Sequence, residues 1–250
     1  MRRLFALLAM LVLVPFPAAA QDEVNVVFLN SDPVVAVHSN FRGQTVTLFG
    51  NIEPLEGAPA GPYGVVILVQ GPSSDWVVRE KARQAGLVLN SASARYAQTP
   101  SYYAILSSSP LAQLVSPEII DRQRLSFSGL AALTRQAGDP AGLDPEFVRL
   151  MRSAGNFVEG ERSVVMHSAT SFSARVPVAS NAANGLYLAR ALIIADGKVI
   201  GETTTRFTVR TQGFERYVAN LARSNSLLYG LATILIALGT GWLGGVLFKR

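Results

Sequence analysis

Short runs of β-branched and aromatic residues, separated by Gly, Pro, Asn and Asp, dominate the chain between Val24 and Thr211. Such runs are typical of antiparallel strands joined by turns. In the first half they lie at 24–29, 34–37, 44–50, 63–70, 76–82, 86–90 and 101–107. The run 63–70 is apolar on both faces, which predicts a central strand. The run 44–50 alternates, which predicts a strand with one side in solvent.

Helical spacing of Ala, Leu, Gln and Arg replaces the strand pattern from residue 111 to about residue 152. Ser116-Pro117-Glu118 and Asp144-Pro145-Glu146 each place a capping residue before a proline, which is typical of a helix start. We therefore expect two or three short helices inserted between two β-rich halves.

Strand-like runs return at 163–169, 171–178 and 185–210, and Asp196-Gly197 predicts a tight hairpin turn within the last of them. This closing meander fits a sandwich of the immunoglobulin-like type. Periodicity leaves open whether the two β-rich halves form one sandwich or two.

Both ends of the chain carry apolar segments. Arg2 and Arg3, an apolar run from Leu4 to Pro17 and the small residues 18–20 predict a signal peptide that is cleaved after residue 20. The 22 residues from Leu227 to Phe248 carry no charge. As a helix they would span about 33 Å, enough to cross a bilayer. An exported N-terminus would leave the body in the bacterial periplasm and only residues 249–250 in the cytoplasm.

The predicted fold class is mainly β, with immunoglobulin-like sandwich lobes, a short helical insertion and one C-terminal transmembrane helix. Phe214, Tyr217 and Leu221 recur at helical spacing, which predicts a helix at the membrane surface. The expected order is a signal peptide (1–20), a periplasmic β-rich lobe (21–110), a helical insertion (111–154), a sandwich-like lobe (155–211), a juxtamembrane helix (212–226), a transmembrane helix (227–248) and a cytoplasmic tail (249–250).

The net charge of +5 and the pI near 9.8 do not indicate a nucleic-acid partner once the charges are located. Without the charges of the two ends, residues 21–226 carry 18 basic and 17 acidic side chains in no long run of one sign. The charge balance of the body therefore implies neither nucleic acid nor anionic lipid head groups as partners. The absence of cysteine excludes disulfides and thiolate metal sites.

No combination of residues in the sequence predicts an enzyme, a metal site or a cofactor. His38 and His167 stand alone, and Ser126-Phe127-Ser128-Gly129 lacks the small residue before the serine that a nucleophile elbow uses. Two pairs of acidic residues, Asp144 with Glu146 and Glu159 with Glu161, resemble the catalytic pair of a glycosidase only in residue type.

The densest charge of the body lies at Arg79-Glu80-Lys81-Ala82-Arg83. Arg79, Lys81 and Arg83 are candidates for holding an anionic ligand, although a strand edge protected by charge explains them as well. Trp76, Tyr102 and Tyr103 could form an aromatic contact surface, but packing in the sandwich is the expected fate of at least one.

Gly241 and Gly245 form a GxxxG pair within the apolar C-terminal segment, which holds five glycines in all. Small residues let a second helix approach closely. These two glycines are therefore candidates for packing against another membrane helix, either of a partner or of a second copy of the chain.

Several stretches resemble an alphaproteobacterial family of transmembrane proteins over nearly the whole mature chain. They are 39–43 leading into 46–50, Val69-Gln70-Gly71-Pro72, 76–81, Pro100-Ser101-Tyr102-Tyr103, Gly213-Phe214-Glu215 and Leu228-Tyr229-Gly230. The resemblance implies a shared architecture and no catalytic residues. It also suggests an association with permeases of the sulfite-exporter type.

Two functions remain open on this basis. The favoured one is a non-enzymatic, membrane-anchored accessory protein that interacts with an integral membrane protein, for instance a transporter of the sulfite-exporter type. The alternative is a periplasmic binding or enzymatic domain for a small anionic or cell-envelope ligand, with Arg79, Lys81 or Arg83 holding the charge.

Overall fold

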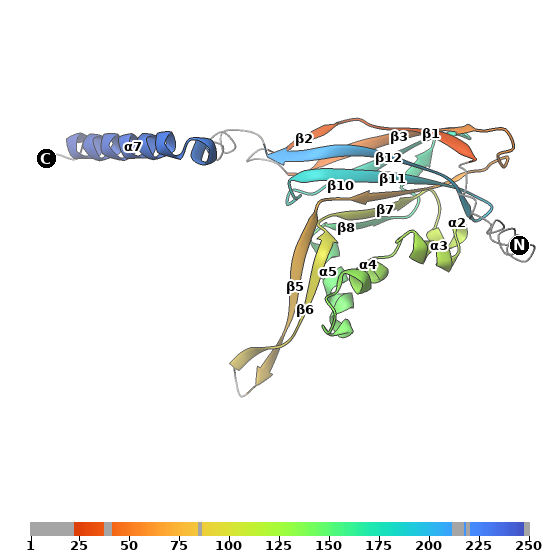
Figure 1. The fold of residues 1–250 in the computed structure, drawn as a ribbon, viewed down its shortest axis with the longest axis horizontal. Helices are drawn as coiled ribbons and strands as arrows, with labels where there is room; N and C mark the ends of the chain where they lie inside the picture. The colour runs from red at the N-terminus through yellow and green to blue at the C-terminus, as the bar shows by residue number, and fades with distance from the viewer. Residues whose placement is uncertain (1–22, 38–41, 85–86, 212–217, 219–220, 248–250) are drawn as a thin grey trace, which may run out of the picture.

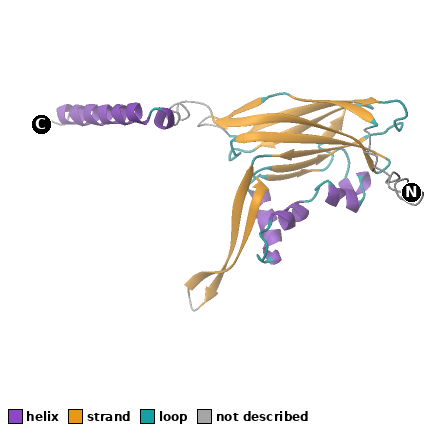
Figure 2. Cartoon of the chain, in the orientation of Figure 1, coloured by secondary structure: helices purple, strands orange, loops and turns teal. Residues whose placement is uncertain are grey.

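The computed structural model describes residues 23–37, 42–84, 87–211, 218 and 221–247. The predicted signal peptide, His38, the cytoplasmic tail and most of the predicted juxtamembrane helix lie outside these residues. Within the body, residues 23–211, two β-sheets pack face to face and short helices cover the far side of one of them (Figures 1 and 2).

The first sheet, called here the outer sheet, has four strands. Its order is β1 (Val24–Asn30), β3 (Gln44–Pro54), β10 (Ser171–Val178) and β9 (Val164–Met166). The second, called the central sheet, has six strands. Its order is β2 (Val34–Val37), β12 (Lys198–Thr211), β11 (Gly185–Ala195), β4 (Gly64–Gln70), β7 (Tyr103–Ser107) and β8 (Phe157–Gly160).

This strand order is that of an immunoglobulin-like sandwich. The outer sheet corresponds to strands A, B, E and D, and β12, β11 and β4 correspond to G, F and C, with β7 beside C as in variable-type domains. Each sheet takes strands from both halves of the sequence, because β3 pairs with β10 and β4 pairs with β11. The two β-rich halves therefore form one sandwich, and the immunoglobulin-like prediction is confirmed.

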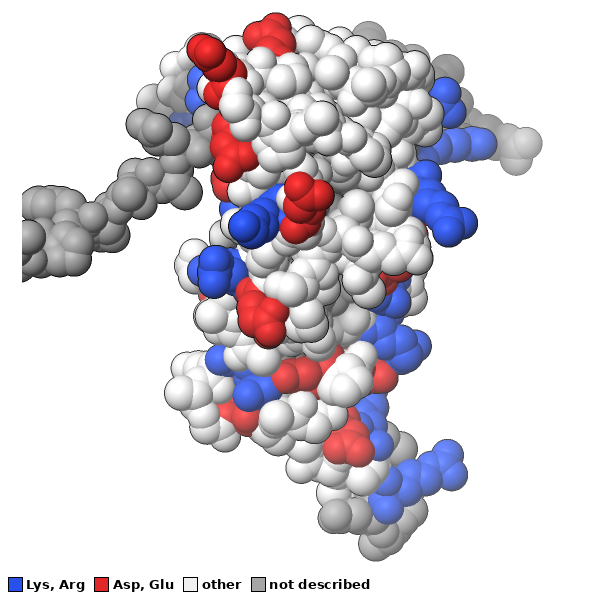
Figure 3. All heavy atoms as spheres, turned by 90° about the vertical axis from the view of Figure 1, so that its right-hand side faces the viewer, with Lys and Arg blue, Asp and Glu red and all other residues white. Residues whose placement is uncertain are grey.

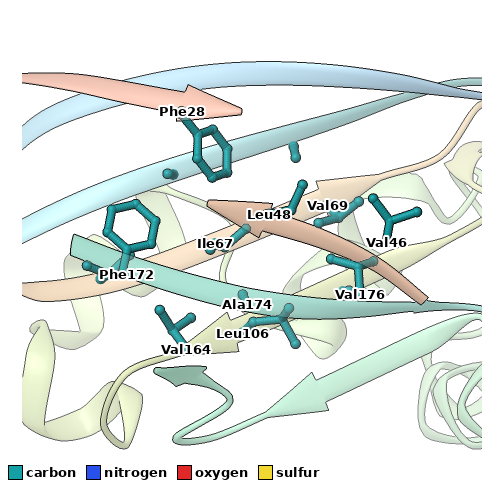
Figure 4. Packing of buried hydrophobic residues seen from close by; sticks show 14 of the residues in the cluster. Phe28, Val46, Leu48, Ile67, Val69, Leu106, Val164, Phe172, Ala174 and Val176 are labelled. Atoms are coloured by element: carbon teal, nitrogen blue, oxygen red, sulfur yellow. The ribbon is translucent and has the colours of Figure 1, made fainter. Parts of the chain in front are cut away.

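The core between the sheets comes from alternate positions of their strands. On β4, Val65, Ile67 and Val69 point into this core, while Val66 and Leu68 point to the helical side. Figure 4 shows Ile67 and Val69 packed among residues of the outer sheet, including Leu48 and Phe172. The central position predicted for this strand is thereby confirmed.

The alternating pattern predicted for β3 is also confirmed. Val46 and Leu48 are completely buried, whereas Thr47 between them is only partly buried and Phe49 after them is 48% exposed on the outer face of the sandwich.

The helical insertion forms a third layer on the central sheet (Figure 2). It consists of α2 (Leu111–Leu114), α3 (Pro117–Arg122), α4 (Phe127–Thr134), the 3-10 helix η1 (Ala141–Leu143) and α5 (Asp144–Ser153). Phe127, Leu130 and Phe147 of these helices pack against the central sheet in a second core. The insertion thus contains more short helices than the two or three expected, because its turns divide it further.

Local turn and cap signals agree with the structure in two of three places. Asp196 and Gly197 have φ angles of 50° and 73°, as a two-residue type I′ hairpin turn requires, and Ser116 precedes α3 with Pro117 as its first residue. Asp144 was expected to cap α5, and this prediction is wrong. Asp144 is the first residue of α5, and its carboxylate binds Arg135 and Tyr96 instead.

A long two-stranded hairpin projects from the body (Figure 1). It is made of β5 (Ser73–Gln84) and β6 (Leu87–Pro100). The strand predicted at 86–90 was too short, since β6 continues through 91–97, where Ser and Ala replace the usual β-branched residues. Ala92, Ala94 and Tyr96 alternate towards the second core, so the periodicity was present but carried by small side chains.

The C-terminal helix α7 (Ser226–Leu247) confirms the predicted apolar helix within one residue at each end. Residues 226–246 are long and apolar enough to span a membrane, and none of the tested window is buried against the rest of the chain. Residues 221–224, just before it, are also helical.

Candidate functional site

The predicted charge cluster lies on the projecting hairpin, where part of it lines an open groove of about 620 Å³ between β5 and α5. Arg79 and Lys81 line this groove, but so do the acidic residues Glu80 and Glu146. Arg83 does not line the groove and is exposed farther along β5. The three cations are therefore not gathered into one pocket, and the two that line the groove share it with negative charge.

The base of the hairpin is held rigidly by aromatic and polar contacts. The ring of Tyr96 on β6 stacks on Phe147 of α5 with a centroid separation of 3.9 Å. Its hydroxyl donates to Asp144 at 2.9 Å, and Asp144 also pairs with Arg135. Burial first, and the Asp144 hydrogen bond and charge second, raise the pKa of Tyr96. The outer half of the hairpin is exposed from Arg79 to Lys81, and Ala92 opposite Glu80 is only partly buried against the second core, so the base is its main anchor.

Ser126 has a structural role at the start of α4. Its hydroxyl accepts a hydrogen bond from the backbone N–H of Gly129 at 3.2 Å, as an N-cap does, and it also bonds to Ser128 at 2.8 Å. His167 is exposed on the edge of the outer sheet, where its ring bonds to the Ser173 hydroxyl at 2.7 Å. Within the described residues, no group of three or more His, Cys, Asp or Glu converges on a point where a metal ion could bind.

The two carboxylate pairs that the sequence singled out do not act as pairs. Asp144 binds Arg135, whereas Glu146 binds Arg149 on the exposed side of α5. Glu159 binds Arg152, and Glu161 is exposed. Each bound carboxylate thus has its own arginine, which is the arrangement of structural ion pairs.

The aromatic contact surface suggested by Trp76, Tyr102 and Tyr103 is not present. Tyr102 and Tyr103 are almost fully buried and point to opposite faces, Tyr102 between the two sheets and Tyr103 towards the helices. Trp76 is half-buried against the helical core. Both tyrosines are buried, on opposite sides of the central sheet, because adjacent residues of an extended chain point to opposite faces.

An exposed apolar row, which was not predicted from the sequence, crosses the outer sheet. Leu29, Phe49 and Val165 are 60%, 48% and 52% exposed. Ser173 completes the row, because Leu29 pairs with Phe49, Phe49 with Ser173, and Ser173 with Val165. Only the pairing of distant strands brings these residues together, although the apolar residue at the outward position 49 was a local signal. We call Leu29, Phe49 and Val165 the apolar row.

Helix α7 concentrates its small residues on one face. Gly241 and Gly245 lie on this face, and apart from the backbone of the helix itself and the adjoining residues, no atom of the described chain comes within 4 Å of a Cβ built on either. The same face holds residues that recur every three or four positions, namely Gly230, Thr233, Ala237, Gly241, Gly244 and Gly245. The hydroxyls of Thr233 and Thr240 are satisfied by carbonyls of their own helix, so this face needs no polar partner.

Charges on the body are interspersed rather than separated. Figure 3 shows Lys and Arg side chains among Asp and Glu over one face of the molecule, with basic residues more frequent along one edge. This agrees with the near-equal numbers of acidic and basic residues in the sequence of the body.

No curated protein and no solved structure gives a significant match to this chain. A family model described as "Putative transmembrane protein (Alph_Pro_TM)" matches residues 25–250. That match covers both sheets, the helical layer, the hairpin and the apolar C-terminal helix. The chain therefore belongs to this transmembrane protein family, as the resemblance of its sequence motifs indicated.

Proposed function

We propose that this chain is a non-enzymatic accessory protein of a bacterial inner membrane, which holds an immunoglobulin-like body in the periplasm and leaves its C-terminus in the cytoplasm. The observation that carries this proposal is the small-residue face of α7. The rest of the described chain does not bury this helix, and its glycines leave room for another helix to approach. Its expected partner is an integral membrane protein.

The apolar row gives the body a second contact surface. Clustered exposed apolar side chains are candidates for protein interaction sites. Leu29, Phe49 and Val165 lie on adjacent or next-but-one strands and are about half exposed. An integral membrane partner with an apolar periplasmic loop could cover them while its helices pack on α7.

The family resemblance directs the choice of partner to a transporter of the sulfite-exporter type. A second copy of the same chain is the competing partner, since GxxxG faces also form homodimers. A binding or enzymatic role for the groove beside Arg79 and Lys81 is less well supported, because the carboxylate residue Glu80 lines the same groove and would oppose an anion there.

The test is crosslinking in intact cells, followed by purification in mild detergent through a C-terminal tag and mass spectrometry of the recovered proteins. Wild type is compared with Gly241→Leu plus Gly245→Leu, which fills the small-residue face. The matched control is Ala232→Leu plus Gly239→Leu. Gly239 precedes Gly241 by two residues, which places it about 200° away around the helix.

We expect one integral membrane protein to be recovered with the wild type and the control, and to be lost with the variant at Gly241 and Gly245. Recovery of the chain only as a crosslinked dimer with itself would identify a homodimer and contradict the accessory role. Recovery of the same partner with both variants would exclude the small-residue face as the contact.

A further inference from the structure

Three arginines from separate segments converge on a pocket at the junction of the central sheet and the helical layer. Arg122 ends α3, Arg124 follows two residues later, and Arg190 comes from β11. They line a pocket of about 370 Å³ together with Leu68, Gln70, Gln123 and Leu188. No carboxylate is among these lining residues.

The backbone that carries two of these arginines is fixed by the buried sheet. The hydroxyl of Tyr103, a fully buried residue of β7, donates to the carbonyl of Arg124 at 2.7 Å. Arg124 adopts a φ of 59°, in the left-handed region that is uncommon for residues other than glycine. The turn after α3 is thus held in a conformation that directs Arg122 and Arg124 to the same pocket.

Arg190 is partly buried and already oriented. Its Nη2 donates to the carbonyl of Gln123 at 2.9 Å, and its Nη1 lies 3.4 Å from Glu202. Its side chain is 25% exposed. These contacts hold the guanidinium at the pocket wall, so that binding a ligand there would cost little further side-chain ordering.

The balance of charge at this pocket favours an anion. Glu202 offsets part of the charge of Arg190, but neither Arg122 nor Arg124 forms an ion pair with a carboxylate in the described part of the chain. Glu118 lies close enough to Arg122 for the arginine to lower its pKa, but its first partner is Ser116. The C-terminal end of α3 would oppose an anion, yet the Gln123 carbonyl there already accepts a hydrogen bond from Arg190.

We infer that Arg122, Arg124 and Arg190 form a binding pocket for a small oxyanion of the sulfate or phosphate type, either free or as the head group of an anionic phospholipid. Guanidinium groups present paired N–H donors that match such oxyanions. Gln123 also lines the pocket, and its side-chain amide is a possible further donor. This site differs from the groove beside Arg79 and Lys81, and it does not depend on the proposed helix contact.

The inference can be tested by isothermal titration calorimetry of the full chain in dodecyl maltoside. Sodium sulfate, inorganic phosphate and water-soluble dihexanoyl phosphatidylglycerol are titrated at constant ionic strength, with chloride and dihexanoyl phosphatidylcholine as reference ligands. The test variant is Arg122→Gln plus Arg124→Gln, which keeps Arg190 and its contacts with the fold. The control is Arg175→Gln plus Arg206→Gln, which removes two exposed arginines from other strands.

We expect saturable binding at one site, weakened at least tenfold in the variant at Arg122 and Arg124 and retained in the control. Binding of sulfate or phosphate would identify a free oxyanion as the ligand. Binding of only the phosphatidylglycerol would identify a lipid head group. Absence of binding by all three anions, or equal binding by wild type and variant, would overturn the pocket. Loss of anion binding in Arg79→Gln plus Lys81→Gln, rather than in the variant at Arg122 and Arg124, would also overturn the pocket.

Discussion

At the scale of single residues, Gly50 shows how the core of the sandwich constrains one position of β3. Gly50 pairs with Phe28 of β1 on one side and with Phe172 of β10 on the other. A Cβ at Gly50 would lie 2.1 Å from the ring of Phe172. The ring therefore occupies the space that any larger residue would need, which explains a glycine in a strand without a turn or a positive φ.

We expect Gly50→Ala to lower the free energy of unfolding by about 1–3 kcal/mol, because the added methyl must displace a buried aromatic ring. Urea unfolding of the full chain in detergent, followed by circular dichroism, measures this change. The control is Gly142→Ala, since a Cβ at Gly142 meets nothing within 4 Å. A loss at Gly142 as large as at Gly50 would show that ring crowding is not the cause.

Asp144 and Glu146 both carry a carboxylate but lie in different surroundings, and their substitutions should differ accordingly. Asp144 is 15% exposed and serves both Arg135 and the Tyr96 hydroxyl, whereas Glu146 is 44% exposed and serves Arg149 alone. We expect Asp144→Asn to cost about 1–3 kcal/mol, because a partly buried arginine loses its partner. Glu146→Gln should cost clearly less, because its ion pair with Arg149 is exposed to solvent. The same unfolding measurement decides, and equal costs would contradict the assignment.

Buried tyrosine hydroxyls should make the fold sensitive to alkali. Burial raises the pKa of Tyr187 to about 12. In an unfolded chain the tyrosine pKa is about 10. The folded chain therefore keeps a proton that the unfolded chain releases. The stability it contributes is complete below pH 10 and is lost as the pH rises to about 12.

We expect Tyr187→Phe to remove its share of this alkaline loss, up to about 1.4 kcal/mol per pH unit. Unfolding free energies at pH 9 and pH 11 measure it. Phe207→Leu is the control, because it disturbs the ring that stacks on Tyr187 at 5.1 Å without removing a titrating group. It should lower stability equally at both pH values, and the same slope in Tyr187→Phe as in wild type would refute the assignment.

At the scale of elements, the sequence indicated strands best where a strand is buried on both faces or alternates strictly between buried and exposed residues. The continuous apolar run of β4 follows from its position between β11 and β7 with cores on both faces. The end of β6 was missed because its inward residues, Ala92 and Ala94, are small and do not give a β-propensity signal. The arginine pocket was missed for a different reason, since Arg190 meets Arg122 only through the docking of α3 on the sheet.

The outer half of the β5–β6 hairpin should be dispensable for folding. Replacing residues 79–93 by Asn-Gly would leave Val78 paired with Ala94 across a two-residue turn. We expect the unfolding free energy to change by no more than about 1 kcal/mol, because an exposed two-stranded ribbon is marginally stable by itself. Tyr96→Ala at the base should cost about 3 kcal/mol or more, since it empties a buried site. Equal losses would mean that the outer half takes part in the core.

At the scale of the whole molecule, composition could predict a β-rich body with one apolar C-terminal helix, but not that its two β-rich halves share one sandwich. Pairings such as Gly50 with Phe172 and Val66 with Leu192 join strands more than a hundred residues apart. Local periodicity shows that each strand has an inward face and does not show which strand it faces. The apolar row arises from the same long-range pairing and was equally invisible.

The orientation of the whole chain can be tested directly because the sequence contains no cysteine. Arg175→Cys introduces a single thiol on the exposed face of β10, and Lys249→Cys introduces one in the predicted cytoplasmic tail. In spheroplasts, a membrane-impermeant maleimide should label Cys at position 175, because an exported body faces the reagent. It should label Cys at position 249 only after the membrane is permeabilised.

The unsubstituted chain has no thiol and gives the background labelling. Resistance of the body to protease shows that each cysteine variant is folded. The reverse labelling pattern would place the body in the cytoplasm and contradict both the proposed export and the periplasmic contact. Labelling of both positions without permeabilisation would mean that α7 does not cross the bilayer, so its small-residue face could not pack against a membrane helix. The outcome therefore decides whether the helix contact and the body contact of the proposed accessory role are available to the same partner.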